Sequence, residues 1–405
     1  MADAQSLIAH LLRRTGFGPR PGQVEALTPA GYGAALDGVL AAAPRTPSKP
    51  LPTKDDDYDK LIDWWLDLLN DPNAGLHEKM VWFWHGHLTS SIDKSGVALM
   101  ARQHETLRKY ALGNARQLFQ AITIDGAMLS WLDGDGSESE GPNENYSREL
   151  MELFALGVGN YTEDDVKHGA YALSGWVIDD ERDSRVGFHS EAGPQKSVSY
   201  LGTTVSSARE VVDAVCSHDK FALHLAGRLY RFFHGVPPTP AVHEELAAVM
   251  RRANLEIAPL VEAILRHPTF TEHRMNRPRL PVEWLVAADA VLDVRPSDNR
   301  RYLLESMGQV PFDPPNVAGW PIAPRWLSAA SVMSRTAYAW EHSRDTEVVS
   351  VADPVGWVLA RASLFEVSAA TKAALDKAAR SIEGRRDLAT LLHALVVSSP
   401  DFALC

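Results

Sequence analysis

Apolar residues recur along most of the chain at the spacing of an amphipathic helix. This spacing, together with strong helix formers, predicts helices over residues 5–13, 22–43, 55–70, 76–85, 97–112 and 114–123. Helices resume after Ser207, with interruptions at Pro237-Pro238 and over the proline-rich run 311–324. The pattern predicts a mainly α protein, a compact multi-helix bundle that we expect to form a single domain over residues 1–405.

Residues 177–201 depart from the helical period. Val186, Phe188, Val198 and Tyr200 alternate with polar residues there, which is the period of a strand with one buried face. We expect a small β-hairpin insertion within the helical domain.

The most informative stretch is 143–157, which is typical of a capped helix and carries a line of ionisable side chains. Asn145, Arg148, Glu149 and Glu152 share one helical face, opposite a cluster of apolar residues. Two carboxylates one turn apart can ligate a metal or act as acid and base if they face inward. An outward face would be an ordinary solvated surface, and the sequence leaves both interpretations open.

A second polar cluster lies in an apolar setting at residues 80–91. Aromatic residues precede His85 and His87 there, and buried imidazoles need hydrogen-bond partners or a metal. In an unbroken helix the two rings would point about 200° apart and could not bind one ion, but Gly86 suggests that the helix ends between them. The alternatives are metal ligands or core histidines that pair with backbone groups.

These segments carry a resemblance to a known family. The matching residues are 79–87, 107–114, 142–154, 157–163, 173–176 and 314–321, within a span from Leu11 to about Arg335. They resemble the bacterial domain-of-unknown-function family numbered eighteen hundred. The resemblance implies a mostly helical fold but no activity. Many relatives carry a secretion signal and accompany a sulfatase-like protein, so it also implies such a protein partner.

The chain departs from the family pattern at two positions. Ser190 follows His189 where relatives often have an aspartate, and His168 stands where the helix after Thr162 usually carries an acid. A site that relies on either acid would lack it here. Thr162 itself, followed by acidic residues, predicts the N-cap of that helix.

Composition narrows the function classes. With 45% hydrophobic and 23% charged residues, the chain matches an ordinary globular protein. No run approaches the ~18 apolar residues of a membrane span, and the first residues lack the basic region of a secretion signal, so we expect a cytoplasmic location. Cys216 and Cys405 are too few for a disulfide framework.

Nucleic acid is not expected as a partner. The formal net charge is −12, whereas binding to phosphates needs a clustered basic face. Arg274, Arg277 and Arg279 form the nearest thing to one, and we expect them to pair with Glu283 or other helix carboxylates rather than with a ligand.

A metal site is the first hypothesis for the chemistry. If the hairpin folds over the 143–157 helix, then His85, His87, His189, Glu149 and Glu152 would form a ligand set suited to iron, manganese, copper or zinc. The alternative for His189 is an exposed hairpin residue.

The segment 308–321 is rigid, aromatic and irregular. Such a composition often lines a pocket; the alternative is a packed connection fixed by its prolines.

Three function classes follow. The first is a metal-dependent enzyme acting on a small molecule or peptide, oxidative rather than hydrolytic. The second is a metal-free acid/base enzyme in which Arg148 holds a carboxylate substrate and Glu149 or Glu152 is the base. The third is a non-catalytic interaction or scaffold protein in which Arg148 pairs with its own carboxylates inside the bundle.

Overall fold

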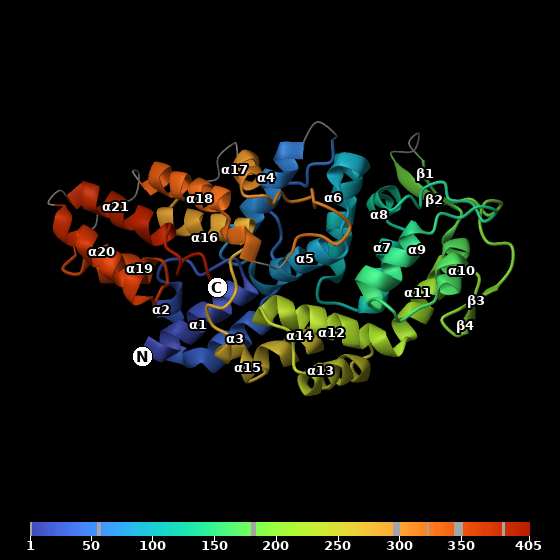
Figure 1. Ribbon diagram of the computed structural model, residues 1–405, viewed down its shortest axis with the longest axis horizontal. Helices are drawn as coiled ribbons and strands as arrows, with labels where there is room; N and C mark the ends of the chain where they lie inside the picture. The colour runs from blue at the N-terminus through green and yellow to red at the C-terminus, as the bar shows by residue number, and fades with distance from the viewer. Residues whose placement is uncertain are drawn as a thin grey trace.

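Helices make up most of the molecule, which confirms the mainly α prediction (Figure 1). The computed structural model describes residues 2–54, 58–179, 184–294, 300–321, 324–343, 351–382 and 385–405. The buried apolar side chains belong to one cluster that extends from Ile8 to Phe402. Among them Trp65, Trp84 and Trp284 are fully buried, and large aromatic side chains dominate the energetics of such cores.

The first third of the chain is helical up to Trp131. Its elements are α1 (Ala2–Thr15), α2 (Gln23–Leu27), η1 (Thr28–Ala30), α3 (Gly31–Ala41), α4 (Tyr58–Leu69), α5 (Gly75–His87), α6 (Ile92–Tyr110), α7 (Ala115–Thr123) and α8 (Gly126–Trp131). The range 22–43, predicted as one helix, is divided into α2, η1 and α3. Pro29 lies within η1, and Gly31 leaves the helical region with a φ of +83°, a conformation that glycine adopts readily. Residues 55–57 of the predicted 55–70 helix lie outside the described residues.

The middle of the chain contains the 143–157 stretch, His189 and all four strands of the described residues. Its elements are α9 (Asn145–Glu149), η2 (Leu150–Ala155), α10 (Glu163–Leu173), β1 (Trp176–Asp179), β2 (Arg185–Phe188), β3 (Val198–Tyr200), β4 (Thr203–Val205), α11 (Ala208–Ser217), α12 (Asp219–His234), α13 (Pro240–Arg252), α14 (Ile257–Arg266) and α15 (Thr269–Glu272).

The last part of the chain returns toward the N-terminal helices. Its elements are α16 (Pro281–Leu292), α17 (Arg300–Ser306), η4 (Pro324–Leu327), α18 (Ala329–His342), α19 (Pro354–Arg361), α20 (Ala369–Ser381) and α21 (Arg385–Val397). Figure 1 shows α16 and α18–α21 gathered at one end of the molecule, and the strands at the opposite end.

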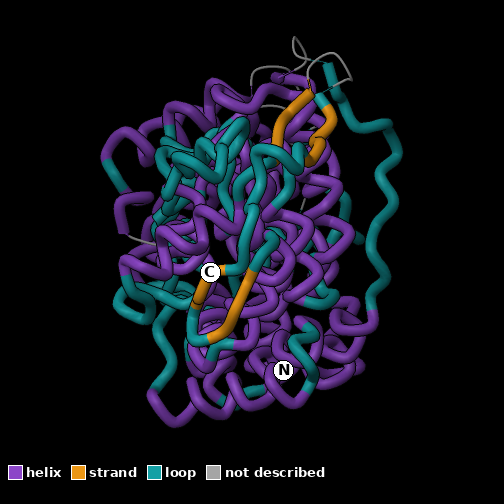
Figure 2. The backbone as a smooth tube through the Cα atoms, turned by 90° about the vertical axis from the view of Figure 1, so that its right-hand side faces the viewer, coloured by secondary structure: helices purple, strands orange, loops and turns teal. Residues whose placement is uncertain are grey.

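The β insertion consists of two hairpins rather than one (Figure 2). β1 pairs with β2, with Trp176 opposite Phe188, and β3 pairs with β4, with Val198 opposite Val205. The apolar alternation over 177–201 predicted β1, β2 and β3 but not β4, which lies beyond residue 201. Strand pairing also depends on where the chain turns. Residues 180–183, within the predicted hairpin, lie outside the described residues.

Among the described residues, none of the helices combines the length and the apolar character needed to span a bilayer.

Candidate functional site

Helix α5 continues through Gly86 to His87, so the predicted helix end between the two histidines is wrong. The main-chain N–H of Leu88 still donates to the carbonyl oxygen of Trp84 in the last turn, at 2.7 Å. Because α-helical neighbours two residues apart diverge, the His85 and His87 rings enter different surroundings.

His85 is part of the aromatic core. Its Nε2 accepts a hydrogen bond from the main-chain N–H of Phe312 at 2.9 Å, and its ring lies edge-on to Trp65, with centroids 5.0 Å apart. Burial lowers the pKa of His85 to about 3. This histidine is a neutral core residue that holds the 308–321 segment against α5.

His87 faces the end of the helix that follows α9. Its Nε2 lies 2.8 Å from the carbonyl oxygen of Phe154, and Nε2 of His224 on α12 lies 3.1 Å from the carbonyl oxygen of Leu153. A carbonyl can only accept, so both rings carry their proton on Nε2 and present Nδ1 as an acceptor.

The two carbonyls belong to η2, a π-helix over Leu150–Ala155. The last carbonyls of a helix lack partners within the helix, and here two imidazoles supply the donors. Burial first, then the charge of Arg228, lowers the pKa of His87 well below its ordinary value and that of His224 to about 4. Both imidazoles are therefore neutral at physiological pH.

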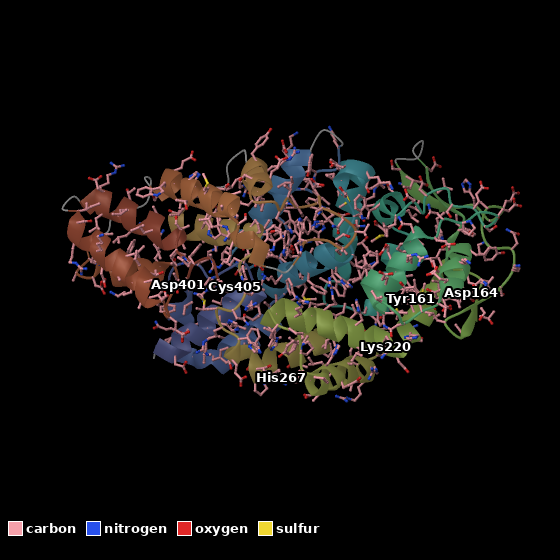
Figure 3. All side chains as sticks on the ribbon, viewed as in Figure 1. Tyr161, Asp164, Lys220, His267, Asp401 and Cys405 are labelled. Carbon is pink, nitrogen blue, oxygen red and sulfur yellow. The ribbon has the colours of Figure 1, made fainter. Side chains whose placement is uncertain are left out.

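The polar face of the 143–157 stretch lies largely at the surface. Arg148 forms a two-pronged ion pair with Glu163, both N–O distances being 2.9 Å, and approaches Glu144 at 3.4 Å. Glu152 accepts a hydrogen bond from the hydroxyl of Tyr161, which lies in the loop before α10 (Figure 3). Partial burial, then the charge of Glu152, raises the pKa of Glu149.

His189 is exposed, and its main-chain N–H donates to the carbonyl oxygen of Gly175 at 2.7 Å. The structure does not bring the five predicted metal ligands together, because His85 and His87 diverge and His189 lies on the hairpin surface. Within the described ranges, no group of three or more His, Cys, Asp or Glu side chains is placed to hold a metal ion.

A pocket of about 280 Å³ opens beside His87. We call it the α5–α12 pocket. It is lined by Trp82, Phe83, Gly86 and His87 of α5, by Arg228, Arg231 and Phe232 of α12, and by Leu280, Gln309, Ala318, Trp320 and Pro321. The 308–321 segment thus lines a pocket, as its composition suggested.

Close packing holds that segment on α5. Gly319 has a φ of +75°, and a Cβ there would lie 2.4 Å from the carbonyl oxygen of Gly86, so only glycine fits. The Thr89 hydroxyl donates to the carbonyl oxygen of Val317 at 2.7 Å. The rings of Trp82 and Trp320 stack, with centroids 5.9 Å apart. Both interpretations of the segment therefore hold: it is a packed connection and also a pocket wall.

Three lining side chains have a buried polar atom without a hydrogen-bond partner: Nδ1 of His87, Nε2 of Gln309 and Nε1 of Trp320. The orientation of the Gln309 amide follows from its contacts, because its Oε1 accepts from the main-chain N–H of Val282 at 3.1 Å. Buried polar groups are usually paired, so three orphans around one pocket indicate a place for a ligand.

Two arginines complete the pocket. Arg228 and Arg231 are exposed, and neither pairs with a carboxylate of the described residues. Partial burial, then the charge of Arg231, lowers the pKa of Arg228. These residues were not predicted from the sequence, although His224, Arg228 and Arg231 follow the four-and-three spacing of one helical face.

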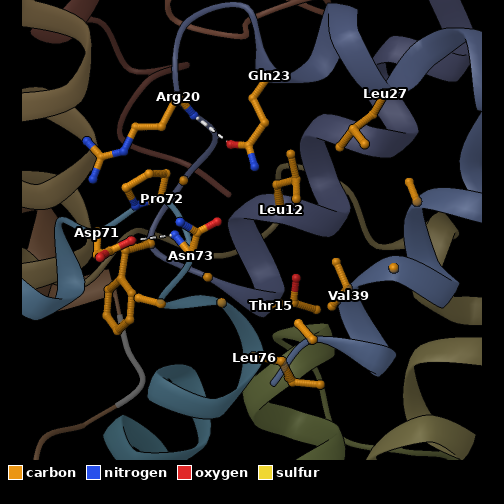
Figure 4. Close-up of a pocket in the computed structure, with 18 of the residues that line it drawn as sticks. Leu12, Thr15, Arg20, Gln23, Leu27, Val39, Asp71, Pro72, Asn73 and Leu76 are labelled. Carbon is orange, nitrogen blue, oxygen red and sulfur yellow. Dashed lines mark hydrogen bonds between the residues drawn. The ribbon is translucent and has the colours of Figure 1, made fainter. Parts of the chain in front are cut away.

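A second cavity, of about 460 Å³, lies between α1, α3 and the turn before α5 (Figure 4). None of its lining side chains has a buried polar atom without a hydrogen-bond partner. The main-chain N–H of Arg20 donates to Gln23 at 2.9 Å, and that of Asn73 donates to Asp71 at 2.8 Å. We therefore take the α5–α12 pocket as the candidate site.

The family model described as "Protein of unknown function (DUF1800)" matches residues 10–404. The chain belongs to the DUF1800 family. The match covers every residue that lines the α5–α12 pocket, so the pocket lies within the part common to DUF1800 proteins. Neither the curated proteins nor the solved structures gave a match.

Proposed function

We propose that the α5–α12 pocket binds an anionic small molecule that carries a flat ring. One observation carries this proposal. Two arginines without carboxylate partners stand at an aromatic pocket whose walls hold three unpaired polar atoms.

The proposed contacts follow from the chemistry of the lining. Guanidinium groups bind carboxylate or phosphate with paired hydrogen bonds, which is the part we assign to Arg228 and Arg231. A flat ring suits the walls formed by Trp320 and Phe232. Nδ1 of His87 would accept a hydrogen bond from a ligand hydroxyl or amine. Leaving a buried polar atom unpaired costs about 1–3 kcal/mol, so each such contact would favour binding.

Titration calorimetry with 4-hydroxybenzoate and phenyl phosphate as probes tests the proposal. We expect both to bind the wild type more tightly than uncharged benzamide. The double variant Arg228→Gln/Arg231→Gln should weaken binding by about tenfold or more, because a charge-assisted hydrogen bond contributes about 1.5–3 kcal/mol.

The matched control is Arg209→Gln/Arg252→Gln, which removes the same charge from two exposed arginines that do not line the pocket. Equal loss of affinity in both double variants would show that the effect comes from net charge alone, and would contradict the site. The absence of any preference for the anionic probes over benzamide would also contradict it.

A metal-dependent enzyme, oxidative rather than hydrolytic, is the second candidate. Its support is that His87 and His224 both donate Nε2–H to carbonyls, the arrangement that orients metal-binding histidines. Elemental analysis of protein purified without added metal tests it. Near-stoichiometric iron, manganese, copper or zinc that is lost in the folded His87→Gln variant would support this candidate. A wild type that takes up none of these metals would contradict it.

The two other hypotheses, an acid/base enzyme and a scaffold protein, have less support. The acid/base enzyme needs the Arg148 guanidinium for a substrate, and Glu163 already occupies it. The scaffold hypothesis placed the Arg148 pairs inside the bundle, whereas these side chains are partly exposed. A cytoplasmic location and a sulfatase-like protein partner stay predictions.

A further inference from the structure

The interior between α1, α16 and α18 contains an unusual number of cations. Six basic side chains are no more than 6% exposed there: Arg13, Arg14, Lys79, Arg277, Arg279 and Arg335. Three of them donate to a carboxylate or to the main-chain oxygen of Cys405. Lys79 and Arg277 both donate to Glu283, and Arg14 donates to the main-chain oxygen of Cys405 at 2.8 Å.

The other three arginines have no carboxylate partner among the described residues. Arg13 bonds to the carbonyl oxygen of Ser363, Nη2 of Arg335 donates to the carbonyl oxygen of Arg279 at 3.2 Å, and Arg279 lies over the ring of Phe402 at 4.3 Å. Arg335 lies over the ring of Trp284 at 5.4 Å. Buried nitrogens without a hydrogen-bond partner remain on all three: Nε of Arg13, Nη1 of Arg279, and Nε and Nη1 of Arg335.

These unpaired charges are unfavourable as they stand. Burial, and then the charge of Arg279, lowers the pKa of Arg13 to about 9 and that of Arg335 to about 10. Glu283 raises the pKa of Arg335, but it is already bonded to Lys79 and Arg277. Cys405 raises the pKa of Arg13 and of Arg279, which leaves Arg335 as the least compensated of the three. Burial of an unpaired charge costs several kcal/mol, so an anion placed beside Arg335 would be favoured.

A pocket of about 290 Å³ adjoins Arg335. Its walls are mainly apolar and include Trp284, Leu327, Val332, Val397 and Leu404. The Ser398 hydroxyl, also on its wall, is buried without a partner. Leu327 and Val332 are 40% and 46% exposed, so the rim is apolar as well. An inorganic ion would not account for these walls.

We propose that this pocket binds a carboxylate with an apolar tail, the carboxylate pairing with Arg335 and the tail packing between Trp284, Val332 and Leu404. The site is distinct from the α5–α12 pocket, since the two share no lining residue. A ligand that binds only the folded state stabilises it, so occupancy should raise the melting temperature.

The test uses the full chain with sodium hexanoate as the probe. Hexan-1-ol and sodium chloride at equal ionic strength are the comparisons, with thermal melting and titration calorimetry as readouts. We expect hexanoate to raise the melting temperature saturably. Arg335→Met, which keeps an unbranched apolar stem but removes the charge, should weaken hexanoate binding at least tenfold.

A second variant covers the case in which Arg335→Met does not fold. Val332→Glu places a negative charge on the exposed rim and should repel hexanoate, whereas Met333→Glu is the matched control, because Met333 is 72% exposed and does not line the pocket. The Arg228→Gln/Arg231→Gln variant should bind hexanoate like the wild type, which separates this site from the proposed function.

Three outcomes would overturn the proposal. The first is a wild type that hexanoate neither stabilises nor binds. The second is Val332→Glu binding hexanoate as tightly as Met333→Glu does. The third is chloride or hexan-1-ol acting as strongly as hexanoate. An equal effect of chloride would mean that the apolar tail is not recognised, and an equal effect of hexan-1-ol would mean that the carboxylate is not.

Discussion

Two arginine–glutamate pairs in this protein have the same N–O distance and opposite environments. Arg277 and Glu283 lie 2.9 Å apart with side chains 2% and 3% exposed, and Arg148 and Glu163 lie 2.9 Å apart with side chains 33% and 67% exposed. The first pair lies near Cys405 and the second near Tyr161, which are well separated in Figure 3.

The environment decides what each pair does. Burial alone raises the pKa of Glu283, but the charges of Arg277 and Lys79 outweigh it and hold the pKa well below its ordinary value. Glu283 also accepts the main-chain N–H of Leu280 at 3.0 Å, at the start of α16. The surface pair needs no such compensation, because water solvates each charge when the other is absent. A short ion pair is thus structural only where water cannot replace the partner.

The largest expected effect is at the buried pair. Glu283→Gln should lower the free energy of unfolding by about 3–5 kcal/mol, because it breaks a buried ion pair. It removes the ion-pair partner of Lys79 and one of the negative charges beside Arg277, the other being at Cys405. Urea denaturation at pH 7.5 measures it. In the wild type this contribution is present above the unfolded-state pKa of about 4.3 and is lost as the pH falls toward the lower folded-state pKa. A loss below about 1 kcal/mol would mean that water reaches the cluster.

A second prediction uses pH to separate the interior from the surface. His85 is neutral when folded, with a pKa of about 3, whereas in the unfolded chain it takes up a proton near pH 6.5. The unfolded state therefore binds more protons, and stability falls as the pH falls below about 6.5.

Between pH 7 and 5, His85 alone should account for a loss of about 2 kcal/mol. His85→Gln can keep an acceptor for the N–H of Phe312, so its own loss over this range should be smaller than that of the wild type by this amount. Identical pH dependence in the two proteins would show that His85 titrates normally in the fold.

A smaller effect is expected at the start of α10. The Thr162 hydroxyl accepts the main-chain N–H of Asp165 at 3.1 Å, and the Asp165 carboxylate accepts the N–H of Thr162 at 2.9 Å. Thr162→Ala should cost about 1 kcal/mol, since one helix donor loses its partner. Thr162→Ser keeps the hydroxyl and should restore most of the stability in the same urea titration.

The smallest effect is expected at the neighbouring residue. Glu163→Gln breaks the surface pair with Arg148, and we expect the denaturation midpoint to stay within experimental error, because exposed ion pairs contribute little. This is the same substitution as Glu283→Gln, so the two variants form a matched pair. Comparable destabilisation by both would refute the distinction between the two regions.

Some of these features were accessible from the sequence. The Thr162 cap and the pairing of Arg277 with Glu283 were predicted and are confirmed, because both depend on residues a few positions apart. The divergence of His85 and His87 followed from the helical period, but Gly86 was given too much weight as a helix end. Glycine weakens a helix without necessarily ending it, and packing against Gly319 favours the small residue here.

The α5–α12 pocket shows what the sequence could not supply. Its residues come from α5, α12 and the 308–321 segment, and no local pattern shows that these segments meet. The predicted metal set failed to assemble for the same reason: it required the hairpin to fold over the 143–157 helix, whereas His189 is on an exposed hairpin.

The sequence by itself determined the helical class, most helix positions, three of the four described strands and the family, since periodicity, capping residues and motifs act over short distances. Only the tertiary structure decided which polar residues are buried, which carbonyls pair with His87 and His224, and which arginines lack a counter-charge. Burial and pairing depend on segments far apart in the chain, and they fix the cost of each charge.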